Sequence, residues 1–176
     1  KGGVNSPMTS SAGRLFDAVS SILGISDVVT FEAEASIALE ASAPDYREVL
    51  SEAPYPFSIL KGTPLTVDLR PAMKTLVKDF TGAVSLSIIS ARFHQTVTEV
   101  ILTVVKTLAL ATGINDVALS GGVFQNRLLS LTAGARLKKD GFRAYFNDAI
   151  PANDAGVSLG QAAVAREIIM KRTHQG

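Results

Sequence analysis

The sequence predicts an α/β protein. Short apolar runs bounded by turn residues alternate with long segments of helical period, and this alternation is typical of α/β domains. We expect four of the runs to be strands, at 57–60, 65–67, 117–119 and 142–146. With 176 residues the chain fits a single domain, 1–176, long enough to bury a sizeable core.

The composition excludes several classes of protein. Lys and Arg number 17 against 16 acidic residues, so no net field draws the chain to nucleic acid or to a membrane surface. Cysteine is absent, which excludes a disulfide framework, a thiolate metal site and a cysteine nucleophile. We expect no apolar run of membrane-spanning length and no signal peptide, so the expected compartment is the cytoplasm. The chain begins with Lys1 rather than Met, as a fragment or a processed product would.

The first predicted helix follows a loop over residues 1–9. Ser10 or Ser11 can cap it and Gly24 ends it. Its apolar stripe consists of Leu15, Phe16, Val19, Ile22 and Leu23. Asp17 points almost opposite the stripe and is therefore not a core residue. A surface ion pair with Arg14 at i,i+3, which would stabilise the helix by a few tenths of a kcal/mol, would explain it.

The next segments are shorter. A brief apolar run at 28–31 precedes a predicted helix over 32–43 that Pro44 ends, and a helical turn is expected at 46–50. Three prolines exclude a long regular element in 53–64. The runs on either side of K-G-T-P predict a hairpin, and a helix should follow from Pro71 to about Phe80.

A long amphipathic helix is predicted from Leu86 to Ala111, with Gly113 at its end. Its core stripe steps by threes and fours through Leu86, Ile89, Phe93, Val97, Val100, Val104, Leu108 and Ala111. His94 lies beside the stripe. A lone histidine there is more often a hydrogen-bonded structural residue than a ligand.

The stretch V-A-L-S-G-G-V-F-Q-N-R-L-L, residues 117–129, is the centre of the functional interpretation. Gly121 and Gly122 separate a strand from a predicted helix over 124–139, so backbone N–H groups can approach an anionic or planar ligand. They follow the carboxyl end of the strand, where open α/β sheets bind ligands. Asn126 should lie on the first helical turn with its amide facing the same crevice. A tight turn whose glycines serve packing alone is the alternative, and the stretch is neither G-x-x-x-x-G-K-[ST] nor G-x-G-x-x-G.

The last predicted helix covers 155–171. Asn153 or Asp154 can cap it, and Gly156 and Gly160, one turn apart, permit close packing on it.

L-S-G-G-V-F-Q-N-R-L-L strongly resembles the signature of the C-terminal carbamoyltransferase domain of the HypF family, which matures NiFe-hydrogenases. Two further runs agree in order and spacing, S-S-A-G-R-L-F-D-A-V-S-S-I-L-G-I at 10–25 and P-A-N-D-A-G-V-S-L-G-Q at 151–161. The resemblance implies an actin-like (ASKHA) fold, whose two lobes close on a nucleotide. This chain matches only the second lobe, the C-terminal lobe of that domain.

The resemblance also implies roles for particular residues. Asp17, in G-R-L-F-D, would contact the ribose, and Gly121, Gly122 and Asn126 would hold the nucleotide. Asp154, in N-D-A-G, would ligate a divalent metal, whether Mg, Fe or Zn. The bound nucleotide would be ATP or carbamoyl adenylate. His94 belongs to an R-F-H run that recurs in the family and is kept as a weaker site candidate.

Three positions depart from the family pattern. Ala33 stands where the family keeps a glycine close to the nucleotide, Glu34 where a neutral glutamine is usual, and Ala155 where N-D-G-G has its first glycine. Either of the first two could weaken binding of an anionic nucleotide; local drift in a working protein is the alternative.

In the intact family this domain passes a carbamoyl group from carbamoyl adenylate to the C-terminal cysteine of HypE, toward the cyanide ligands of the hydrogenase iron. The implied partners are therefore the missing N-terminal lobe and a HypE-like acceptor, with no nucleic acid and no membrane. The competing hypothesis is a degenerate, non-catalytic nucleotide-binding or assembly lobe. A sugar-kinase-like or acetate-kinase-like protein ranks lower, since it would not need V-F-Q-N-R-L-L.

Overall fold

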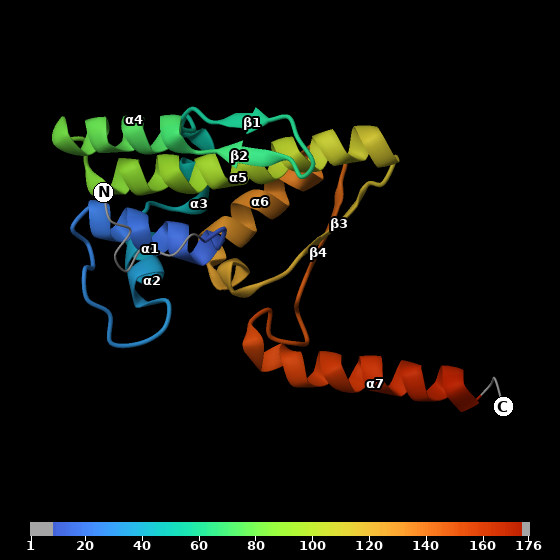
Figure 1. Ribbon diagram of the computed structural model, residues 1–176. Coiled ribbons are helices and arrows are strands. Elements are labelled where there is room, and N and C mark those ends of the chain that lie inside the picture. Colours follow the sequence, from blue (N-terminus) through green and yellow to red (C-terminus); the bar gives the residue numbers. More distant parts are fainter. Residues whose placement is uncertain (1–8, 174–176) are drawn as a thin grey trace.

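The computed structural model describes residues 9–173 as a mixed α/β arrangement (Figure 1). In chain order the elements are α1 Ala12–Ile22, α2 Glu34–Ala41, α3 Tyr46–Ser51, β1 Ser58–Leu60, β2 Thr66–Asp68, α4 Arg70–Thr81, α5 Leu86–Thr112, β3 Asp116–Leu119, η1 Gly122–Gln125, α6 Arg127–Lys139, β4 Arg143–Phe146, η2 Asp154–Gly156 and α7 Val157–Thr173.

Most predicted boundaries are confirmed, because they depend on local chemistry. Ser11 caps α1, accepting the backbone N–H of Arg14 at 3.3 Å. Strands β1 and β2 form the predicted antiparallel hairpin, and Pro71 lies in the first turn of α4. Gly113 ends α5 in the left-handed conformation, φ 73°, and bonds back to the Ala109 carbonyl. The predicted start at Pro71 is therefore within one residue of the observed one.

Helix α5 is the central helix of the structure. It contacts α3, α4 and α6, and it supplies buried residues to all three core clusters, among them Phe93, Leu102 and Ala91. By length and composition alone, α5 is also long and apolar enough to cross a membrane. The expectation that the chain has no apolar segment of membrane-spanning length is therefore wrong. The predicted core stripe of α5 is confirmed only in part: Ile89 and Phe93 are buried, whereas Leu86, Leu108 and Ala111 are exposed. Leu102, which the stripe left out, is buried in the second half of the helix.

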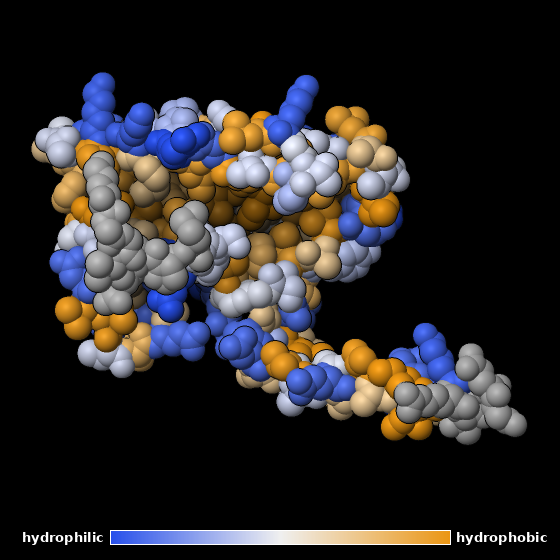
Figure 2. Space-filling model, viewed as in Figure 1, coloured by the Kyte–Doolittle hydropathy of each residue, from blue (hydrophilic) through white to orange (hydrophobic). Residues whose placement is uncertain are grey.

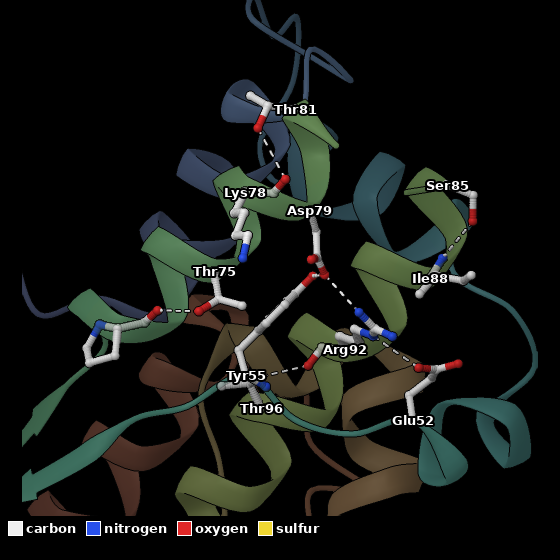
Figure 3. A network of polar contacts seen from close by, with 11 residues as sticks. Glu52, Tyr55, Thr75, Lys78, Asp79, Thr81, Ser85, Ile88, Arg92 and Thr96 are labelled. Carbon is white, nitrogen blue, oxygen red and sulfur yellow. Dashed lines mark hydrogen bonds and ion pairs between the residues drawn. The ribbon is translucent and has the colours of Figure 1, made fainter. Parts of the chain in front are cut away.

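A polar network fastens α4 to α5 (Figure 3). The Arg92 guanidinium donates to Asp79 at 2.8 Å and to Glu52 at 3.2 Å, and the Tyr55 hydroxyl donates to the same Asp79 carboxylate at 3.0 Å. Burial and Asp79 together raise the pKa of Tyr55, so its hydroxyl stays protonated and can donate. The Thr96 hydroxyl accepts the backbone N–H of Tyr55 at 2.7 Å. Arg92, the first residue of R-F-H, therefore has a structural task.

Strands β3 and β4 pair in parallel, with Val117 opposite Ala144 and Leu119 opposite Phe146. These four side chains face α5 and α6, and Gly134 lets α6 approach the Phe146 ring, which would lie 3.1 Å from an added Cβ. The opposite face of the pair is open, with Tyr145 exposed. Within the described residues neither strand has a second neighbour. A parallel sheet is normally covered on both faces, so this one is incomplete.

The predicted final helix is present as α7, but it does not pack as expected. It extends away from the rest of the structure (Figure 1), and every side chain from Val157 to Lys171 is exposed. No atom lies within 4 Å of a Cβ built on Gly160, so close packing through this glycine is not observed. The large apolar side chains that α7 exposes are Val157, Leu159, Val164, Ile168, Ile169 and Met170, and Figure 2 shows them as orange patches along it. A helix with this surface is usually buried.

Candidate functional site

The two positions after β3 are glycine for different structural reasons. Gly121 has φ 104° and ψ 155°, a region that essentially only glycine adopts. Gly122 has no positive φ, and a Cβ built on it would lie 3.9 Å from the Cβ of Asn153. The second glycine therefore marks where the turn meets the loop that carries Asn153 and Asp154. The turn does follow the carboxyl end of β3, as predicted.

The helix predicted from residue 124 begins three residues later. Residues Gly122–Gln125 form a 3-10 turn, and α6 starts at Arg127. Asn126 is therefore the N-cap of α6 and not a residue of its first turn, which corrects the prediction. Its side-chain oxygen accepts the backbone N–H of Leu129 at 2.7 Å, and its nitrogen lies 3.2 Å from Nε2 of His94. The amide is thus engaged on both ends.

A carboxylate occupies the N-terminus of α6. Glu40, on α2, accepts the backbone N–H of Leu128 at 2.8 Å. An anion at this position interacts favourably with the helix dipole, so Glu40 takes a place that a phosphate could otherwise take. No local pattern in the sequence indicates this role of Glu40, because its partner is 88 residues away. Among the described residues the backbone N–H groups of Gly121, Gly122 and Val123 have no hydrogen-bond partner, so a ligand would have to use the turn and not the helix end.

His94 is fully buried below the turn. Its Nδ1 lies 2.8 Å from the carbonyl oxygen of Ser90, and its ring meets those of Phe16 and Phe93 edge-on. Burial lowers the pKa of His94 to about 4, so the ring is neutral at physiological pH. The prediction of a hydrogen-bonded structural histidine is confirmed, and its second bond joins it to Asn126.

Asp17 lies on α1, which contacts the turn Gly122–Gln125. Its carboxylate is half-buried and lies 3.7 Å from the Arg14 guanidinium, the i,i+3 pair that the helical spacing predicts. This contact explains the residue without a ligand, while its helix places it beside the candidate site.

Ala33 and Glu34 lie at the start of α2, which contacts α1. The predicted helix over 32–43 begins only at Glu34, because Ala33 is its N-cap in the left-handed conformation, φ 65°. The Glu34 carboxylate accepts the N–H and the hydroxyl of Thr30, and these bonds lower its pKa. Glu34 thus closes the loop before the helix and is favourable in the first helical turn. Both departures from the family pattern therefore affect the local structure: Ala33 through its left-handed conformation and Glu34 through its hydrogen bonds to Thr30.

Replacing Ala33 with glycine should stabilise the chain by about 0.4–1 kcal/mol. An alanine at positive φ places its Cβ unfavourably, and glycine removes that strain. Had residue 33 been helical, as the sequence suggested, the same change would destabilise the chain. Urea unfolding of Ala33→Gly beside Ala38→Gly, a change inside α2, decides between the two: the first should unfold at higher urea than the parent and the second at lower. A lower midpoint for both would contradict the left-handed conformation.

Asp154 is exposed and begins the 3-10 turn before α7, while Asn153 caps that turn through a 3.2 Å bond to the N–H of Ala155. Gly156 is required there, since a Cβ would lie 2.7 Å from the Pro151 carbonyl oxygen. The described residues hold no group of three His, Asp or Glu side chains that could bind a metal ion. Asp154 could therefore be one ligand at most, and the residues present do not fit a complete metal centre.

The structure thus brings part of the predicted set together. The turn at Gly121 and Gly122, Asn126 and His94 form one contiguous group, and Gly122 abuts the loop of Asp154. Asp17 is carried on a helix against the same turn. Ala33 lies at the far end of α2 from Glu40, the residue on that helix that bonds α6.

Comparison with known proteins identifies relatives along nearly the whole chain. Residues 1–161 match the family model described as the carbamoyltransferase, Kae1-like domain, second subdomain. The carbamoyltransferase HypF of Synechocystis is 38% identical over 156 residues, which are 88% of this chain and 19% of that protein. A HypF homologue of Cupriavidus necator is 37% identical over 92% of this chain and 42% of its own length.

Solved structures agree. A full-length HypF crystallised in its phosphate- and nucleotide-bound form matches 91% of this chain with a TM-score of 0.84 at 38% identity, and this match covers 21% of that protein. HypF of T. kodakarensis shares the fold with a TM-score of 0.71 at 23% identity. The chain therefore spans a minor part of the length of these relatives. It belongs to the HypF carbamoyltransferase family and corresponds to the second subdomain of the Kae1-like domain.

Proposed function

We propose that this chain forms the second lobe of an actin-like (ASKHA) domain and supplies one side of the nucleotide site of a HypF-like carbamoyltransferase. The observation that carries the proposal is the turn after β3, where three backbone N–H groups without partners among the described residues lie beside Asn126 and the loop of Asp154. Such donors suit the phosphates of ATP or carbamoyl adenylate.

The remainder of the site would come from the missing N-terminal lobe. Two surfaces support this partner: the open face of the β3–β4 pair and the apolar side chains of α7. Both are surfaces that proteins normally cover. The small share of each relative's length that the chain spans agrees with such a partner.

The proposed reaction passes the carbamoyl group from carbamoyl adenylate to the C-terminal cysteine thiolate of a HypE-like acceptor: a C–S bond to the cysteine forms, the C–O bond to the phosphate breaks, and AMP leaves. The cysteine must come from that acceptor, because this chain has none. Negative charge develops on the carbamoyl oxygen when the thiolate attacks, and backbone donors at a glycine turn can stabilise it. Asp154 would supply one ligand to a divalent metal. A cytoplasmic location remains a prediction.

The second candidate is a non-catalytic lobe that binds a nucleotide or assembles with a partner without acting on carbamoyl groups. Ala33 in a conformation that suits glycine and the carboxylate of Glu40 at the α6 N-terminus favour it. Glu34 no longer does so by itself, since its bonds to Thr30 give it a local task.

Nucleotide binding by this chain should be weak and should depend on the turn. In calorimetry with Mg-ATP, Gly122→Val should abolish binding, because the branched side chain would fill the approach to the backbone donors. Gly160→Val, on the exposed face of α7, is the matched control and should bind as the parent does. Equal affinity of the parent and Gly122→Val would place any nucleotide site elsewhere.

The purified chain should show no turnover of carbamoyl phosphate and ATP, because half of the expected ligands lie outside it. Addition of a HypF that lacks only this subdomain should restore the activity if the chain is a working lobe, and should fail to restore it if the lobe is degenerate. Turnover by the 176-residue chain alone would contradict the division of the site between two lobes.

A further inference from the structure

The buried side chain of His94 has a defined proton arrangement. A carbonyl oxygen can only accept, so the Nδ1 atom, 2.8 Å from the Ser90 carbonyl oxygen, must carry the hydrogen. The ring is fully buried and neutral, so Nε2 presents a lone pair. His94 therefore acts as an acceptor on the side that faces the candidate site.

The partner of that lone pair is the side chain of Asn126, whose nitrogen lies 3.2 Å from Nε2. Two partners independently determine the orientation of the amide. Its NH2 group must face the lone pair of His94, and its oxygen must face the N–H of Leu129 at 2.7 Å. Among the described residues this leaves one N–H of the Asn126 amide without a protein partner, on a half-buried side chain at the glycine turn.

The histidine is itself held from several sides. The Ser90 hydroxyl donates to the Leu39 carbonyl of α2 at 2.7 Å, and the next residue, Glu40, accepts the N–H of Leu128 at 2.8 Å. The Phe16 ring packs edge-on against the imidazole with 5.3 Å between centroids. Helices α1, α2 and α5 therefore fix the ring to which Asn126 is bonded.

We propose that His94 is a positioning residue: its Nε2 holds the Asn126 amide in the one orientation that leaves an N–H for a nucleotide at the turn. This role rests on the proposed nucleotide site. A histidine that only filled the core would need partners for its nitrogens, but those partners would have no reason to include the cap residue beside the glycines.

The first experiment determines, without a ligand, which ring nitrogen of His94 carries the hydrogen. In the background of His174→Gln, His94 is the only histidine of the chain, and nitrogen-15 NMR of its ring should show hydrogen on Nδ1 and a lone pair on Nε2. Asn126→Asp retains an oxygen for the Leu129 N–H but turns a carboxylate toward Nε2. This change should raise the pKa of His94 by about 1–3 units. Hydrogen on Nε2 in the parent, or an unchanged pKa in Asn126→Asp, would overturn the proposal.

The second experiment compares two substitutions of similar size. His94→Gln offers a carbonyl oxygen near the position of Nε2, whereas His94→Leu offers no acceptor. With Mg-ATP as the probe, His94→Leu should raise the dissociation constant by about tenfold and His94→Gln by less than about threefold, when both are compared below their melting temperatures. Equal affinities for these two variants would overturn the positioning role. If the parent binds no ATP while NMR gives the expected protons, the proposed nucleotide site fails and the His94–Asn126 bond stands.

Discussion

The free energy of unfolding should fall by about 3 kcal/mol between pH 6.5 and pH 4, and His94 should account for this loss. In the folded chain burial lowers its pKa to about 4, against about 6.5 in an unfolded chain. Below pH 6.5 the unfolded state therefore binds a proton that the folded state does not, and stability decreases by about 1.4 kcal/mol for each pH unit until the folded pKa is reached. Above about pH 7.5, where the histidine of the unfolded chain is also neutral, it should cause almost no pH dependence.

Urea unfolding at several pH values from 7.5 to 4 tests this. His94→Gln removes the titration while keeping a polar side chain, so its stability should vary much less across the same interval. Carboxylates whose pKa is lowered by partners, such as Asp68 beside Arg70 with a pKa of about 2, lose their contribution mainly below this interval and do so in both proteins. Parallel stability curves for the parent and His94→Gln would show that the ring is not buried as the structure has it.

The elements that the sequence predicts correctly are those set by short-range chemistry. Ser11 begins its helix and Gly113 ends its own through hydrogen bonds to residues three or four positions away. Such hydrogen bonds can be inferred from residue type. The hairpin follows from two apolar runs around a proline turn. The strand before the glycine turn is predicted to within one residue, because a short apolar run marks it and the glycine pair limits it on one side.

Most features that the sequence does not predict depend on contacts between residues far apart in the chain. Glu40 binds α6 across 88 positions, and no local pattern indicates this bond. The sequence pattern places Asn126 on the wrong side of the helix start, because a 3-10 turn and an α-helical turn have nearly the same pattern over four residues. The left-handed conformation of Ala33 could have been found, since glycine at the matching position of the family is a signal for positive φ. The resemblance to the family explains that glycine only by its closeness to the nucleotide.

The two glycines of the turn should differ in what their replacement costs. Gly121→Ala should destabilise the chain by about 1–3 kcal/mol, because φ 104° with ψ 155° is a conformation that side chains with a Cβ rarely adopt. The cost is backbone strain and not a clash, since no atom lies within 4 Å of the Cβ built on Gly121. Gly122→Ala should change stability by less than about 0.5 kcal/mol, because its nearest atom, the Cβ of Asn153, would lie at an ordinary contact distance of 3.9 Å.

Urea unfolding of the two alanine variants measures the difference, and calorimetry with Mg-ATP adds a second consequence. The strain at Gly121→Ala can be relieved only by rotation of the adjoining peptide groups, which would turn the N–H groups of residues 121 and 122 away from their present directions. Gly121→Ala should therefore lose nucleotide affinity even at temperatures where it is fully folded, while Gly122→Ala, with one methyl group near the donors, should lose less. If the two variants unfold at the same urea concentration, the turn does not hold Gly121 in the conformation described. If they differ in stability but bind Mg-ATP equally, the backbone of the turn is a structural feature of this lobe and the nucleotide donors lie elsewhere.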